Sequence, residues 1–259
     1  MADSPGPSPY VPDPGPAACP PPQHTGAAET PDASSSAPEP GGHPEPSDGP
    51  LLIVCALAIE RLALRAGARG VQGRATVLRT GMGPVNAARG VGAALADPCL
   101  RGAAVIASGF CAGLAPDMRP GDLVVATRTR GAEHATGADA DTPCTETSAL
   151  ADAVARAVPG RQVHTGVLIG SAHIVRGPER AALHAGGAIA VDMESAVSLR
   201  TALAVGPRPV AAVRVVVDAP EHELVRIGTV RGGISAFHVL RAVLPAFHEW
   251  HRSLLLPRR

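Results

Sequence analysis

Two short stretches of the chain place carboxylates where a folded protein could use them for chemistry. GAIAVDMESA (187–196) carries Asp192 and Glu194 on either side of Met193, directly after a small apolar run. VAAVRVVVD (210–218) is a second apolar run, and it ends on Asp218. Partial desolvation favours the neutral form of a carboxyl group, so Asp218 is a candidate general acid. An Asp that caps the turn before Pro220 is the alternative interpretation.

Glu60 and Glu194 both lie near the expected start of a helix, and each allows two interpretations. A carboxylate in the first turn is favoured by the helix dipole whatever its function. Alternatively, Glu194 accepts two hydrogen bonds from a diol. We expect Asp192, two residues before Glu194 in the motif, to be structural.

Arg214 interrupts an otherwise apolar strand. A buried guanidinium is costly without an anionic partner. The alternation of side chains along a strand places Arg214 and Asp218 on one face of the sheet. We therefore expect Glu60 or Asp218 to be the partner of Arg214.

The elements that must position these residues alternate between strands and helices. Strands are expected at 51–57, 75–80, 103–109, 121–130, 163–171, 188–191 and 210–218, with FCAG (110–113) as a turn. Helices are expected at 58–67, 85–96, 147–158, 193–203 and from about 233, and residues 131–145 as a loop. This order predicts an α/β domain with a largely parallel sheet. In such sheets ligands bind beyond the carboxyl ends of the strands, where the candidates converge: Glu60, residues 80–83, 109–113 and 171–174, residues 192–194, and Asp218.

Composition separates an N-terminal tail from this domain. Residues 1–49 are rich in Pro, Gly and Ser and nearly free of Leu, Ile, Val and Phe, which predicts a disordered tail before a domain at 50–259. The net charge is zero, which argues against nucleic acid as a partner. The five cysteines show no CxxC spacing, and no signal peptide or spanning run is evident, so we expect reduced thiols and a soluble cytoplasmic protein.

Several chemistries are disfavoured by the residues present. The chain contains no Lys, which excludes Schiff-base chemistry and a phosphate-binding P-loop lysine. TGMGP (80–84) fails as a dinucleotide fingerprint because Asn86 stands where the third glycine belongs. The histidines lack metal-ligand spacing, so neither a metal nor another cofactor is expected. Cys111 has no evident base partner and is expected to be a core residue.

Four motifs in this order resemble the purine nucleoside phosphorylase and nucleosidase superfamily: TGMG (80–83), SGFCAGLAPDMRPGDLVVA (108–126), AVDMESA (190–196) and VRVVVDAPEHE (213–223). The similarity spans Leu51 to the C-terminus. Within the superfamily the chain is most similar to hopanoid-associated phosphorylases, which act on adenosylhopane. The resemblance implies an α/β/α sandwich around a mixed sheet, and cleavage of a ribosyl C1′–N9 bond.

The resemblance also implies roles for individual residues. Asp218 matches the acid that protonates the purine N7, Glu60 the carboxylate that orients the attacking water, and Arg214 the arginine that supports Glu60. The matching substrate-binding positions are Glu194 and Met193 at the ribose, His173 and Ile174 beside the base, and Phe110, Cys111, Ala112 and Gly83 lining both. Two departures stand out: Val217 replaces a serine before the acid, and Phe110 replaces a serine of the nucleosidases.

The residues at the expected site favour hydrolysis over phosphorolysis. Phosphate capture normally uses several Arg or Lys donors, yet Ala107 occupies the phosphorylase arginine position and Glu60 would repel an anion. Phosphorolysis of adenosylhopane, cleavage of small purine nucleosides such as methylthioadenosine, and a non-catalytic nucleoside-binding protein are the alternatives. The resemblance further implies a homo-oligomer.

The C-terminal segment 234–256 also allows two interpretations. Its apolar side chains at helical spacing, with arginines beside them, fit an interfacial helix in peripheral contact with a membrane. The alternative is a helix packed on the sheet or on a partner, kinked at Pro245.

Overall fold

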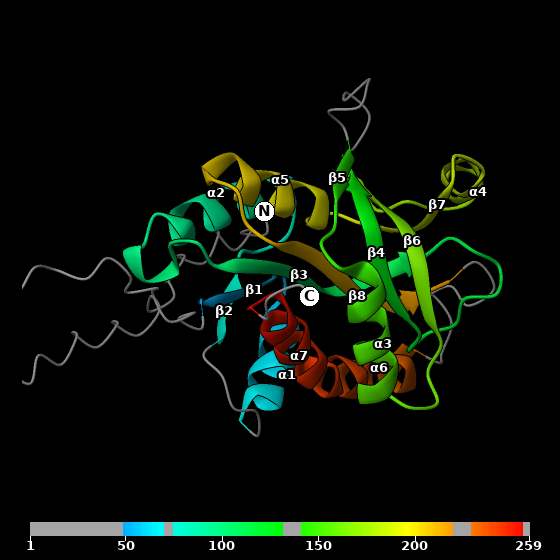
Figure 1. The fold of residues 1–259 in the computed structure, drawn as a ribbon. Coiled ribbons are helices and arrows are strands. Elements are labelled where there is room, and N and C mark those ends of the chain that lie inside the picture. Colours follow the sequence, from blue (N-terminus) through cyan, green and yellow to red (C-terminus); the bar gives the residue numbers. More distant parts are fainter. Residues whose placement is uncertain (1–48, 70–74, 132–140, 220–228, 256–259) are drawn as a thin grey trace, which may run out of the picture. The chain divides into compact units, whose positions relative to one another are not determined.

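The computed structural model describes residues 49–69, 75–131, 141–219 and 229–255 (Figure 1). The predicted disordered tail, apart from Gly49, lies outside the described residues. So does most of the expected loop 131–145, of which residues 132–140 are not described.

The centre of the domain is an eight-stranded mixed sheet. Its strands run in the order β2-β1-β3-β7-β6-β4-β5, and β8 pairs with both β3 and β4, closing a circuit of strands. The pairs β3–β7, β4–β5 and β4–β8 are antiparallel, so the mixed sheet implied by the resemblance is confirmed and the largely parallel one is wrong in these places. The strand bounds are β1 Leu51–Cys55, β2 Ala75–Arg79, β3 Ala104–Gly113, β4 Leu123–Arg130, β5 Asp141–Pro143, β6 Val163–Gly170, β7 Ala188–Asp192 and β8 Val210–Asp218.

Helices cover both faces of the sheet, as Figure 1 shows. On one face α1, α3, α6 and α7 pack over alternate strand residues such as Leu51, Ile53 and Ile106. On the other face α2 and α5 pack over the intervening residues, including Leu52 and Val105. The expected α/β/α sandwich is therefore confirmed. The helix bounds are α1 Ala58–Ala68, α2 Pro84–Leu95, α3 Thr147–Ala157, α4 Pro178–Ala185, α5 Ser195–Val205, α6 Thr229–Ala242 and α7 Leu244–Leu255, with a short 3₁₀ helix at Pro98–Leu100.

The C-terminal segment packs inside the domain instead of presenting an interfacial face. Leu240, Leu244, Phe247 and Trp250 are almost completely buried in the core that α1 and α3 share. The helix is broken between α6 and α7 at Val243, two residues before Pro245, which occupies the first turn of α7 as proline tolerates. The packed interpretation is thus confirmed. No helix of the described residues has the length and apolar character needed to cross a bilayer.

Two local expectations are wrong, and one helix was not expected. FCAG (110–113) continues β3 instead of turning, because β8 pairs with it as far as Ala112 opposite Asp218, and β7 pairs with Ala112 and Gly113. Helix α5 begins at Ser195, with Glu194 as its N-cap, instead of at Met193. Helix α4, which has one buried residue among eight, was not expected at all.

Candidate functional site

The carboxylate of Glu60 is buried at the carboxyl ends of β1 and β3. Its Oε2 accepts hydrogen bonds from the backbone N–H groups of Ala56 and Leu57, at 2.9 and 2.8 Å. Its Oε1 accepts one from the Phe110 N–H at 2.7 Å. The bond to the N-cap Leu57 belongs to the start of α1, whereas the Phe110 bond comes from a distant strand. Glu60 is therefore a first-turn acid that is also turned towards the end of β3.

Arg214 lies next to this carboxylate but forms its ion pair with another residue. Its Nη2 is 2.7 Å from Asp192 Oδ2, its Nε donates to Ser195 Oγ at 2.9 Å, and its Nη1 donates to the Ser108 carbonyl at 3.1 Å. The expectation that Glu60 or Asp218 is the partner is thus corrected to Asp192, because the end of β7 and the start of α5 face the middle of β8. Burial alone would lower the pKa of the guanidinium, but Asp192, Glu60 and Glu194 outweigh it and raise that pKa.

The backbone at Gly109 explains how Glu60 and Arg214 come so close. A Cβ atom built there would lie 2.4 Å from Glu60 Oε1 and 2.6 Å from Arg214 Nη1. The residue also has φ of +143°, a conformation that favours glycine. Only glycine lets the two charged groups meet across β3.

Glu194 is held at the opposite side of the cluster. The Gly83 N–H, which precedes α2, donates to Glu194 Oε1 at 2.8 Å. Burial raises the pKa of Glu194, while Arg214 and the Gly83 N–H lower it. The neighbouring Met193 is half-buried. Gly83 and Glu194, far apart in the sequence, are therefore brought together as predicted.

Residues 110–112 line this region as part of β3. Cys111 is buried, and its burial raises the pKa of the thiol far above the ordinary value. A thiol in that state is a poor nucleophile, in agreement with the expected core role. Phe110 and Ala112 are half-buried, and Ala112 lies opposite Asp218 in the β3–β8 register. Asp218 thus ends β8 next to the candidate lining of the site.

Asp218 has a partner that sequence reasoning missed. Arg180 of α4 places Nη2 at 2.5 Å from Asp218 Oδ2, and both side chains are largely buried. Arg180 lies in the first turn of α4, after Gly177 and Pro178. No feature of GPER (177–180) distinguishes it from a surface helix start, so the sequence carried no signal for this pairing.

His173 and Ile174 lie apart from the buried cluster, on the segment between β6 and α4. The Ile174 side chain is 68% exposed and His173 is exposed as well. The His173 ring lies 2.9 Å from Glu179 Oε1, a contact that ties this segment to the residue before Arg180. The structure therefore places these two residues on the exposed segment before α4, next to the helix that carries Arg180.

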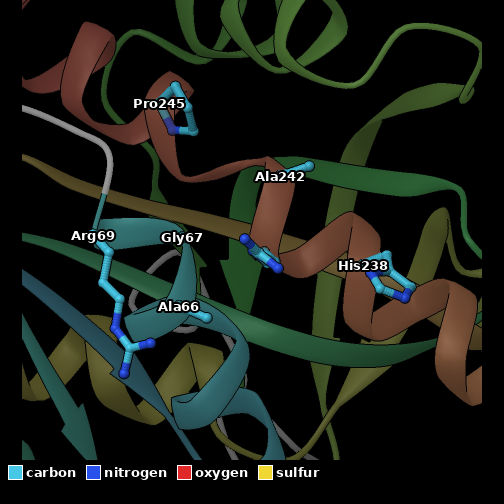
Figure 2. Close-up of a pocket in the computed structure, with 7 residues that line it drawn as sticks. Ala66, Gly67, Arg69, His238, Ala242 and Pro245 are labelled. Carbon is cyan, nitrogen blue, oxygen red and sulfur yellow. The ribbon is translucent and has the colours of Figure 1, made fainter.

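A separate pocket of about 640 Å³ lies away from these residues. Figure 2 shows it between the end of α1, with Arg69, and helix α6, with His238. Its lining contains none of the predicted site residues. The described part of the chain also has no group of three or more His, Cys, Asp or Glu that could hold a metal ion.

The buried cluster has the components of an acid–base site. The guanidinium of Arg214 is paired with Asp192, and the carboxylates of Glu60 and Glu194 act on it electrostatically. Asp192 is paired with Arg214 and accepts a hydrogen bond from the Ser195 N–H. The other two carboxylates are anchored by backbone N–H groups, Glu60 by that of Phe110 among others and Glu194 by that of Gly83. Such anchored carboxylates can accept hydrogen bonds from hydroxyl groups or water.

Comparison with known proteins identifies the fold of this arrangement. The family model described as phosphorylase superfamily matches residues 65–244. The solved 5′-methylthioadenosine/S-adenosylhomocysteine nucleosidase of Neisseria meningitidis, in complex with methylthio-immucillin-A, is 20% identical with a TM-score of 0.65, covering 78% of this chain and 99% of its own. Futalosine hydrolase of Helicobacter pylori is 17% identical with a TM-score of 0.65, covering 78% and 98%.

A third solved structure agrees with these two. The S-adenosylhomocysteine nucleosidase of Streptococcus pyogenes is 21% identical with a TM-score of 0.64, covering 81% of this chain and 98% of its own. A search of curated proteins finds no match.

Proposed function

The chain belongs to the phosphorylase superfamily, and we propose that it is an enzyme of that superfamily, a purine nucleosidase that cleaves the N-glycosidic bond of adenosylhopane by hydrolysis. The products are adenine and ribosylhopane. The observation that carries this proposal is the position of Glu60, buried beside Arg214 and anchored by three backbone N–H groups.

Water is the nucleophile that best suits this cluster. A phosphate ion would have to enter beside the carboxylates of Glu60 and Glu194, with Arg214 already paired to Asp192. Like charges at such short range oppose binding of an anion. Water, in contrast, can donate a hydrogen bond to Glu60, which takes its proton as the oxygen attacks C1′.

The other site residues have complementary roles in the proposal. Glu194, held by the Gly83 N–H, accepts hydrogen bonds from the ribose hydroxyls, and Met193 packs on the sugar. The electron pair of the C1′–N9 bond passes to the purine, and Asp218 supplies a proton to N7. Arg214 holds the cluster together through Asp192, Ser195 and the Ser108 carbonyl.

Exposed apolar residues next to the site support an apolar substrate. Ile59 and Leu62 lie within two residues of Glu60, and Met82 and Val85 lie within two residues of Gly83. These four side chains are 46 to 76% exposed. Exposed apolar side chains around a polar site suit an apolar substituent on the ribose. The same residues are the ones we propose for a peripheral membrane contact or for the partner surface of a homo-oligomer.

The similar solved structures favour a second candidate. Two of them are nucleosidases of methylthioadenosine or S-adenosylhomocysteine and one is a futalosine hydrolase. A nucleosidase for a small purine nucleoside such as methylthioadenosine would use the same cluster.

A competition assay separates the candidates. Purified protein is given adenosylhopane in detergent micelles and methylthioadenosine in the same vessel, and the ratio of the kcat/KM values is taken from the amounts of ribosylhopane and methylthioribose formed. The proposal expects a preference for adenosylhopane of at least tenfold. Equal or better cleavage of methylthioadenosine would select the second candidate, and binding of adenine with no turnover of either would leave a nucleoside-binding protein.

A further inference from the structure

The guanidinium of Arg180 is buried and has two nitrogens that no described residue engages in a hydrogen bond. The residue is only 5% exposed, and Nη2 is paired with Asp218. Within the described part of the chain, Nε and Nη1 are buried and have no hydrogen-bond partner. A buried polar group left in this state costs about 1–3 kcal/mol, more for a charged one. Such a cost is expected where a ligand supplies the missing acceptor.

The position of Arg180 indicates which part of a ligand would reach it. Asp218 ends β8 opposite Ala112 of β3, and α4 brings Arg180 to the same place. The neighbouring Glu179 holds His173 in the segment before α4. Arg180 therefore lies beside Asp218, the residue that faces the base in the proposed function, whereas Glu60 and Glu194 have the water and ribose roles.

We propose that Arg180 binds the leaving purine directly, with Nε or Nη1 donating a hydrogen bond to an acceptor nitrogen of the base while Nη2 holds Asp218. This inference rests on the proposed function, in which Asp218 faces the base. As the C1′–N9 bond breaks, its electron pair moves onto the purine, and the guanidinium stabilises that charge until N7 is protonated. Arg180 is thus a base-recognition residue as well as the partner of the acid.

Binding of free adenine tests this role without dependence on the 5′ substituent of the substrate. Isothermal titration calorimetry compares the wild-type protein with Arg180→Met, Arg180→Lys and Arg208→Met. Arg208 is a matched control, because it too has a buried nitrogen without a partner in the described residues, Nη1, but it precedes β8 at the strand's opposite end. The expected result is a dissociation constant raised about tenfold or more in Arg180→Met, partly restored in Arg180→Lys, and unchanged in Arg208→Met.

A double-mutant cycle separates direct contact from an effect through Asp218. Adenine affinity is measured for Asp218→Asn with and without Arg180→Met, and circular dichroism confirms that each variant is folded. Direct contact predicts a further loss of at least fivefold when Arg180→Met is added to Asp218→Asn. Equal adenine affinities of Asp218→Asn and of the double variant would overturn this inference but not the proposed function. Adenine binding by Arg180→Met within twofold of wild type would do the same. Failure of the wild-type protein to bind adenine would overturn the proposed function with it.

Discussion

Asp192 Oδ2 lies 2.7 Å from Arg214 Nη2, and both side chains are almost completely buried. This pair joins the end of β7 to the middle of β8, and Ser195 at the start of α5 completes it through Arg214 Nε. The guanidinium that sits beside Glu60 and Glu194 is therefore fixed by a carboxylate that has no other proposed role. The pair positions the site instead of taking part in the reaction.

Removing the charge of Asp192 is expected to leave the buried guanidinium without its ion-pair partner. We predict that Asp192→Asn lowers the free energy of unfolding by about 3 kcal/mol, the usual scale for breaking a buried pair. Urea denaturation followed by circular dichroism measures the loss. Ser195→Ala, which removes only a neutral acceptor from Arg214, is the control and should cost about 1 kcal/mol. A loss in Asp192→Asn no larger than in Ser195→Ala would show that the pair is not structural.

Glu60 is predicted to be essential for the chemical step and not for binding. Glu60→Gln keeps an acceptor for the backbone N–H groups but cannot take the proton of water, so kcat should fall about a hundredfold or more with KM within a few fold. Steady-state release of adenine measures both constants. Asp152→Asn, an exposed acid on α3, is the control and should match the wild type. A Glu60→Gln enzyme with wild-type kcat would remove the proposed base.

Glu194 is predicted to cost stability at neutral pH. Burial raises its pKa in the folded protein above the ordinary value of a glutamate side chain. A group of this kind favours folding below its unfolded pKa, and that contribution is lost as the pH rises through the folded pKa. Glu194→Gln should therefore be more stable than wild type at pH 7 and equally stable near pH 4, while its activity falls about tenfold or more through the lost ribose contact. Denaturation at the two pH values, with an activity assay, checks this; a variant less stable at pH 7 would contradict the desolvation argument.

Gly109 is predicted to tolerate no side chain, because a Cβ would collide with Glu60 and Arg214. Gly109→Ala should destabilise the protein by about 2 kcal/mol more than Gly102→Ala and abolish most activity. Gly102 is a matched control: it has φ of +72°, so it suffers the same kind of backbone strain, but it has no atom within 4 Å of its built Cβ. Thermal melts and adenine release compare the two. Equal stability and activity in the two variants would show that the close approach at Gly109 does not matter.

The sandwich and the residues of the buried cluster could be predicted from the sequence, but the ion-pair partners of Arg214 and Asp218 could not. Apolar runs and the alternation of helices and strands are local signals, and they sufficed for β1, β3, β8 and the helices around them. The placement of Glu60, Glu194 and Gly83 followed from the rule that strand ends converge. The partner of Arg214 was missed because β7 packs antiparallel to β3, a pairing that no local pattern encodes. Arg180 was missed because its burial depends on how α4 packs in the folded protein and not on any local pattern.

The most direct test of the account is the dependence of adenine release on phosphate, with the sugar product identified by mass spectrometry. Adenosylhopane in detergent is incubated with the wild-type enzyme in phosphate-free buffer and in a phosphate buffer. The account predicts equal rates and ribosylhopane as the product in both, because Glu60 and Glu194 exclude the anion and Glu60 directs water to C1′. A rate that requires phosphate, with a phosphoribosyl product, would contradict it.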